Sequence, residues 1–263
     1  MIAAITPPVM GVVIFLTILS GAGLGMLLGR FLPAHHLTDQ SRSVITVATA
    51  VVGTASALVL GLLISTASSA FTQRSGEVGR IAVDIIRVDR LLRNYGPEAD
   101  GARQSLARYA AIEREDLFPE ESNNAAKVEK PGAVQLLDDI RHALFLLQPS
   151  DDSQRPIKDR ALQLLDEMAD TRWLLAFQQN ISPIPPAFLI MLVFWLTILF
   201  GTFGLFAPRN VTVAAALVLS AVAVSAGIEL VLDMTDPFNG IVRISNAPMR
   251  HALEMIRHDD PTP

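Results

Sequence analysis

The residues whose type and spacing most suggest chemistry are three acids at the end of the last long apolar run. Glu229 and Asp233 are four positions apart, so a helix places them on one face, and Asp236 follows just before Pro237. Carboxylates this close repel one another and need a cation, an arginine or water beside them. Three interpretations are open: an arginine-paired cap where a helix leaves a membrane, an acidic ring at a channel mouth that concentrates cations, or a divalent-ion site. The arginines that could supply the cap are Arg74, Arg172 and Arg243.

Other candidates for catalysis or metal binding are weak. His35 and His36 are adjacent, which is not a coordination spacing, and His251 and His258 belong to the C-terminal tail. A solvated surface explains both pairs. No glycine-rich phosphate loop, nucleophile elbow or paired-carboxylate signature is present. The chain has no cysteine, which excludes disulfides, thiol catalysis and thiolate metal sites. We therefore expect no enzyme activity, no cofactor and no metal site.

The apolar residues are concentrated in long stretches that lack charge. Hydrophobic residues make up 51% of the 263 positions, and a transmembrane helix needs about 20 of them in succession. We predict an all-α integral membrane protein with four transmembrane helices. These are expected at about 8–31, 44–71, 186–206 and 210–232. The net charge of −5, without a basic cluster, gives no sign of nucleic-acid binding.

The spans divide the chain into four predicted parts. They are residues 1–71 with the first two spans, a soluble helical insert at 72–182, a transmembrane hairpin at 183–234, and a tail at 235–263 with a short amphipathic helix. Arginines flanking the membrane are more numerous on the side of the insert than on the opposite side. The insert and both termini are therefore expected in the cytoplasm.

The insert is predicted to be all-α and continuous with the second span. Its apolar residues follow a heptad pattern, and no strong helix terminator occurs before Gly96 and Pro97. The residues of this seam are Val78, Ile81, Ile85, Val88 and Leu92. Three more helices are expected at 97–117, at 133–148, and after Pro149 with Ser150 or Ser153 as the cap, giving a four-helix layer.

Small residues mark faces of the first two spans. Gly21, Gly25 and Gly29 recur every four positions, a pattern typical of close helix packing or of an oligomer contact. In the second span, small and hydroxyl residues fall on one side of the helix, which indicates either packing or the lining of a pore. The candidate pore residues are Thr46, Thr49, Gly53, Ser56, Ala57, Gly61, Ser65 and Ser68.

Three motifs resemble those of the bestrophin-like domain family of bacterial and plant membrane proteins. They are YGPE at 95–98, FGLFAPRN at 203–210 and DPFNG at 236–240, and the likeness extends from about residue 44 to 250. The resemblance implies a distant relation to bestrophins, four-span anion channels that assemble as pentamers with the second helix lining the pore. However, residues 45–70 contain no Phe, Tyr or Trp for an aromatic constriction, and no acidic run matches the calcium site of animal bestrophins.

The leading hypothesis is an oligomeric ion channel of the bacterial inner membrane, with the second span lining the pore. Its partners would be the lipid bilayer, further copies of the chain and inorganic ions. The acidic group argues for cations and the family resemblance for anions. The alternative is a non-conducting scaffold or sensor whose helical insert binds a protein partner. A transporter is less well supported, because no span is interrupted in mid-membrane.

Overall fold

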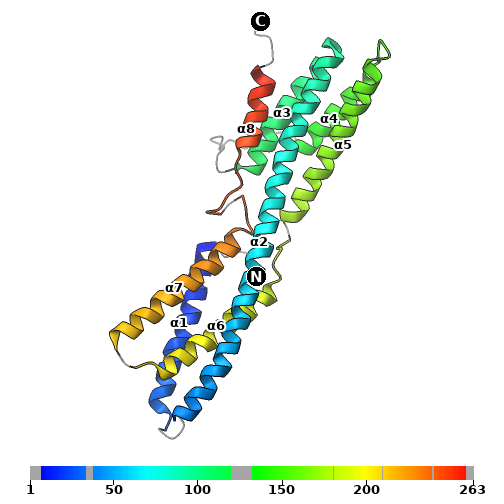
Figure 1. The fold of residues 1–263 in the computed structure, drawn as a ribbon. Coiled ribbons are helices and arrows are strands. Elements are labelled where there is room, and N and C mark those ends of the chain that lie inside the picture. Colours follow the sequence, from blue (N-terminus) through cyan, green and yellow to red (C-terminus); the bar gives the residue numbers. More distant parts are fainter. Residues whose placement is uncertain are drawn as a thin grey trace. The chain divides into compact units, whose positions relative to one another are not determined.

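The computed structural model describes residues 7–33, 38–119, 132–179, 181–208, 210–238 and 240–258. His35, His36, Asp259 and Asp260 lie outside the described residues, as does the side chain of His258. Within the described ranges the regular structure is helical throughout, which confirms the predicted all-α class (Figure 1). The elements are α1 (Pro7–Phe31), α2 (Asp39–Tyr95), η2 (Pro97–Ala99), α3 (Asp100–Leu117), α4 (Ala133–Leu146), α5 (Gln154–Gln179), α6 (Pro186–Phe206), α7 (Val211–Asp233) and α8 (Ala247–His258).

The chain forms two compact units. The first, which we call the membrane unit, comprises residues 1–71 and 182–242, and the second, the helical unit, comprises 72–181 and 243–263. Helices α1, α2, α6 and α7 are long and apolar enough to cross a membrane, in agreement with the four predicted spans. The tail that we expected as one segment is divided, because residues 243–263 group with the insert.

Helix α2 runs through 57 residues without a break, as predicted. It contains no proline, and its glycines weaken a helix without ending it. The helix ends where Gly96 adopts a φ of 122°, a conformation that L side chains rarely adopt, and Pro97 then starts η2. A single helix therefore contributes both an apolar membrane segment and part of the helical unit's core.

In the membrane unit, α1 packs on α6 through backbone contacts. A Cβ atom added to Gly21 would lie 2.5 Å from the carbonyl oxygen of Thr197, and one added to Gly29 would lie 2.8 Å from that of Leu205. Gly25 meets the carbonyl of Gly201 in the same way. The three glycines thus share one close helix–helix contact. The sequence reasoning did not single out its partner, Gly201, on α6.

The helical unit is held by large apolar side chains. The heptad seam of α2, from Val78 to Leu92, has exposed fractions of 1% or less, and it belongs to a core with the other helices of the unit. The predicted four-helix layer is too small, because α8 adds a fifth helix that packs on α3. The apolar residues Leu253 and Ile256 of this helix are buried.

Two local expectations in the helical unit are wrong. The helix predicted at 133–148 ends at Leu146, and the side chain that accepts from the backbone N–H groups at the start of α5 is that of Asp151 rather than that of Ser150 or Ser153. The Asp151 carboxylate accepts hydrogen bonds from the Ser153 and Gln154 backbone N–H groups at 2.8 and 2.9 Å. These bonds and one from the Ser153 hydroxyl lower the pKa of Asp151. A carboxylate at this end of a helix also interacts favourably with the helix dipole.

Candidate pore face and acidic group

The membrane segment of α2 leaves one apolar face uncovered by the described part of the membrane unit. The side chains of this face are between 61% and 72% exposed, and we call it the outer face. Its residues are Val44, Val47, Val51, Leu58 and Leu62. Their spacing of three, four or seven positions places them on one side of the helix. In a membrane such a face contacts lipid, contacts another copy of the chain or lines a pore.

The opposite side of α2 anchors the helix in the membrane unit. Leu63 and Ala67 are buried in an apolar core that includes Ile18 of α1 and Leu192 and Leu196 of α6. This core lies in the second half of the membrane segment. The first half of that segment, from Arg42 to Gly53, contributes instead to a groove described below.

The eight predicted pore residues do not form one surface. Ser56 is 3% exposed, and Thr49, Gly53 and Ser68 are half-buried. Thr46, Ala57, Gly61 and Ser65 are exposed. By helical spacing, Ser65 lies on the same side as Val47, Val51 and Leu58. Only part of the predicted set therefore lies beside the outer face, and lining of a pore by these residues stays a prediction.

The hydroxyl groups of this segment bond to their own helix. Thr46 donates to the carbonyl of Arg42 at 2.8 Å, Thr49 to that of Ile45 at 2.7 Å, and Ser56 to that of Val52 at 2.8 Å. In each bond the hydroxyl group donates to a backbone carbonyl of the preceding turn, so its hydrogen-bonding capacity is satisfied without water. The hydroxyl stripe therefore does not by itself require water.

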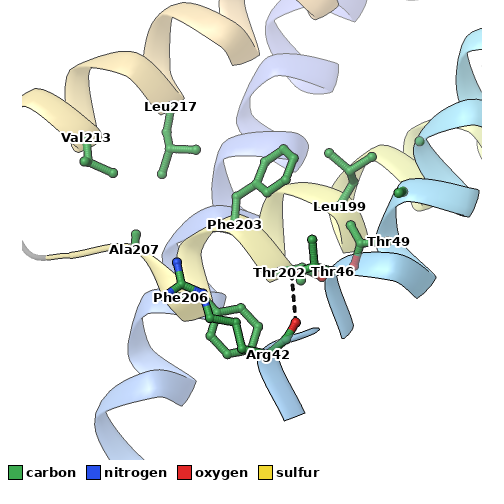
Figure 2. Close-up of a pocket in the computed structure, with 12 residues that line it drawn as sticks. Arg42, Thr46, Thr49, Leu199, Thr202, Phe203, Phe206, Ala207, Val213 and Leu217 are labelled. Atoms are coloured by element: carbon green, nitrogen blue, oxygen red, sulfur yellow. Dashed lines mark hydrogen bonds between the residues drawn. The ribbon is translucent and has the colours of Figure 1, made fainter. Parts of the chain in front are cut away.

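A groove opens between α2, α6 and α7, with a volume of about 450 Å³ (Figure 2). Thr46 and Thr49 of α2 lie along one side, and Val213 and Leu217 of α7 lie along the other. Gly53 of α2 also belongs to the lining. The floor is formed by α6, and the lining residues of that helix are Leu199, Thr202, Phe203 and Phe206. At one end the Arg42 guanidinium lies 5.8 Å from the centre of the Phe206 ring, a cation–π distance. No pattern in the sequence indicated this groove.

Asp233 of the acidic group closes a turn. Its side chain is 2% exposed and accepts hydrogen bonds from the backbone N–H groups of Ile241 at 2.9 Å and Val242 at 2.7 Å. The carboxylate also lies against Gly240, where a side chain would meet it. Asp233 thus fixes the segment that follows α7, and both of its oxygens already have donors.

The other two acids lie in different surroundings. Glu229 is half-buried, and its carboxylate packs against Gly11 of α1, while Asp236 is exposed. In the described part of the chain no group of three His, Cys, Asp or Glu side chains is close enough to hold a metal ion. Within the helical unit, Arg74 donates to the carbonyls of Gln178 and Ile181 at 2.8 and 3.4 Å.

The helical unit contains buried carboxylates with uneven pairing. Arg172 pairs with the buried Glu113 and, at 3.3 Å, with Asp116. Asp84 accepts a bond from Arg87 at 3.1 Å through one oxygen, whereas the other has no hydrogen-bond partner among the described residues. Burial raises the pKa of Asp84, and the Arg87 guanidinium opposes that effect only in part.

The comparisons with known proteins agree with this architecture. The family model described as the bestrophin-like domain matches residues 16–249. The chain belongs to the bestrophin-like family. The family resemblance expected from the three motifs is thereby confirmed. No match was found among curated proteins.

Crystal structures of bestrophin homologs share the fold of this bestrophin-like chain. A point mutant of a bacterial homolog from Klebsiella pneumoniae gives a TM-score of 0.67 at 14% identity, covering 93% of this chain and 98% of that one. A second structure of a bacterial homolog from the same organism gives 0.64 at 14% identity, covering 92% and 97%. A point mutant described as a membrane protein gives 0.67 at 16% identity, covering 95% and 99%. At these identities the likeness shows the fold alone.

The three bestrophin-like motifs fall at the ends of helices. YGPE spans the end of α2 and the start of η2, where Gly96 has its positive φ. FGLFAPRN ends α6 and supplies Asn210, whose side chain caps α7 by accepting from the Val213 N–H at 2.7 Å. Gly240 of DPFNG lies against the Asp233 carboxylate, which accepts from the backbone N–H groups directly after the motif. Arg209 and Asn239 within these motifs lie outside the described residues.

Proposed function

We propose that this protein is an oligomeric ion channel of a bacterial inner membrane, in which α2 lines the pore. The insert and both termini lie in the cytoplasm. The observation that carries the proposal is the outer face of α2, which no described helix of the membrane unit covers along the segment from Val44 to Leu62. A ring of copies that turns this face inward encloses a path lined by one helix from each copy.

The small residues of α2 support this arrangement. Gly61, Gly76 and Gly79 have no atoms of the described chain within 4 Å of where a side chain would begin. A helix that surrounds an axis with its copies needs narrow side chains where the copies approach, and glycines provide them. Ser65 adds a hydroxyl group beside the outer face.

We propose that the conducted ions are anions. The argument for cations depended on three carboxylates acting together, but the Asp233 carboxylate is occupied by backbone N–H groups and Glu229 packs against α1. Only Asp236 is exposed. The relation to bestrophins that the family resemblance implies favours anions.

Cysteine modification in liposomes tests both parts of the proposal. The chain has no native cysteine, so Ser65→Cys and Ser56→Cys form a matched pair of exposed and buried positions. For an anion pore, a cationic thiol reagent should raise chloride flux through Ser65→Cys, and an anionic reagent should lower it. Neither reagent should change flux through Ser56→Cys. Liposomes that conduct no ion at any tested pH would contradict the proposed channel. A chloride flux that falls with the cationic reagent and rises with the anionic reagent would contradict the proposal that the conducted ions are anions.

The scaffold alternative has one observation in its favour. The heptad seam is buried within the helical unit and is not available to a partner, but Trp173 and Phe177, one turn apart on α5, are both more than half exposed. These rings could meet a protein partner. Capture of a stoichiometric partner by the full-length protein, lost in Trp173→Ala and Phe177→Ala, would favour a scaffold.

A further inference from the structure

We propose that the groove between α2, α6 and α7 binds one acyl chain of an anionic phospholipid, whose phosphate lies against Arg42. This inference concerns lipid recognition by the membrane unit. It goes beyond the proposed channel activity and does not depend on ion conduction.

The groove is apolar although its lining includes threonines. Thr46 and Thr49 donate their hydroxyl protons to α2, and Thr202 donates to the carbonyl of Ile198 on α6 at 2.9 Å. These three threonines and the side chains of Phe203 and Leu217 line the groove (Figure 2). A surface without available donors holds hydrocarbon better than water or ions.

The sequence around Arg42 predicts that this residue lies at the level of the phospholipid headgroups. It is the last charged residue before the uncharged stretch 43–73, and α6 ends nearby in the same groove at Phe206. The guanidinium lies over the Phe206 ring at 5.8 Å, and no carboxylate among the described residues forms an ion pair with it. A cation held at the bilayer surface attracts anionic headgroups, and guanidinium groups bind phosphate with paired N–H donors.

The shape and the charge of the groove fit one molecule. An apolar groove of about 450 Å³ ends at Arg42, the one cation among its described lining residues, which is the arrangement that an amphiphile with an anionic head requires. A zwitterionic lipid would place its phosphate at the same site, but its own ammonium group would reduce the attraction. We therefore expect phosphatidylglycerol to be preferred over phosphatidylcholine.

Native mass spectrometry of the full-length protein, purified with an equal mixture of these two lipids, tests the proposal. The wild type should retain phosphatidylglycerol over phosphatidylcholine, and Arg42→Gln should reduce that preference about fivefold, the value expected for one arginine at a bilayer surface. Ala50→Trp, which fills the groove, should abolish retention. The matched controls are Arg30→Gln at the end of α1 and Ala48→Trp, an exposed α2 position outside the groove lining, and both should behave as the wild type.

Each other outcome would overturn the proposal. Equal retention of both lipids, or no retained lipid in the wild type, would show that the groove does not bind an anionic phospholipid selectively. An equal loss in Arg30→Gln would show a general effect of surface charge. Dissociation of an oligomer in Arg42→Gln and Ala50→Trp, without a change in lipid retention, would show that a second copy of the chain fills the groove.

Discussion

The two parts of α2 bury their apolar side chains to very different extents, although they form one uninterrupted helix. In the helical unit, Val78, Ile81, Ile85, Val88 and Leu92 are almost completely buried by the chain itself. In the membrane unit, the outer face from Val44 to Leu62 is largely exposed. The difference follows from the solvent, because apolar exposure is costly in water but carries no such cost in lipid.

The two units also use different packing devices. The membrane unit brings α1 and α6 together through glycines, so that main chains touch, whereas the helical unit buries large side chains. This agrees with the weaker drive to bury apolar side chains between helices in lipid, where close van der Waals contact contributes more of the association. The predictions below test these differences, beginning with the largest expected effect.

Replacement of Gly25 by leucine should prevent assembly of the membrane unit. A side chain there would enter the backbone of Gly201, which cannot move aside as a flexible side chain could. We expect loss of monodisperse protein in size-exclusion chromatography, equivalent to a destabilisation above about 4 kcal/mol. The control is Gly23→Leu, because a side chain at Gly23 meets nothing within 4 Å. Equal yields of the two variants would show that α1 and α6 do not pack through their backbones.

Leucine-to-alanine changes at the two ends of α2 should have unequal effects. Leu92→Ala removes a side chain that is 1% exposed and should cost about 2–5 kcal/mol in the free energy of unfolding. Leu58→Ala, at a side chain that is 72% exposed, should cost little. Denaturant unfolding followed by circular dichroism measures both. A large cost at Leu58 would show that the outer face is covered tightly in the assembly, which would argue against an open pore there.

The buried carboxylate of the membrane unit should matter for local order. Asp233→Asn replaces one of the two accepting oxygens with an NH2 group, which cannot accept a hydrogen bond from Ile241 or Val242. The expected cost is about 1–3 kcal/mol, the penalty for a buried donor left without a partner. Faster amide hydrogen exchange at Ile241 and Val242 would report it. In Asp39→Asn, at an exposed side chain at the start of α2, exchange at these amides should be unchanged.

Asp84, one of the buried carboxylates of the helical unit, should have a smaller and opposite effect. Because burial raises the pKa of Asp84 above 3.8 in the fold, protonation favours folding. The contribution of protonated Asp84 to the free energy of unfolding is fully present below pH 3.8, and it is lost as the pH rises through the higher folded-state pKa. Asp84→Asn should therefore raise the Tm slightly at neutral pH and flatten the dependence of Tm on pH in that window. Asp159→Asn, at an exposed residue of the same unit, should change neither.

Helix positions followed from the sequence because they depend on local properties. Charge-free length gave the four spans, and the lack of proline between positions 39 and 95 gave the continuous α2. The glycines of α1 indicated a close contact, but their partner Gly201 could not be identified, because spacing on one helix does not tell which helix lies opposite. The cap of α5 was assigned to a serine because several nearby residues can cap, and only the backbone geometry selects Asp151.

The candidate site depended more on the tertiary structure. Helical spacing grouped Thr46, Ser56 and Ser65 on one broad side, but the neighbouring α6 and α7 cover part of that side and leave the rest exposed. The sequence grouped the acids at 229, 233 and 236 because they lie close together along the chain. In the structure the Asp233 carboxylate instead accepts hydrogen bonds from backbone N–H groups of the segment that follows α7.

The sequence by itself determined where this chain can cross a membrane, that it is helical, and that α2 continues from the apolar segment into the core of the insert. These properties depend on side-chain transfer energies and on backbone preferences within a few turns. Only the tertiary structure decided which face of α2 stays uncovered, which acid is buried, and that an apolar groove ends at Arg42. Those outcomes depend on contacts between residues far apart in the chain, which no local pattern specifies.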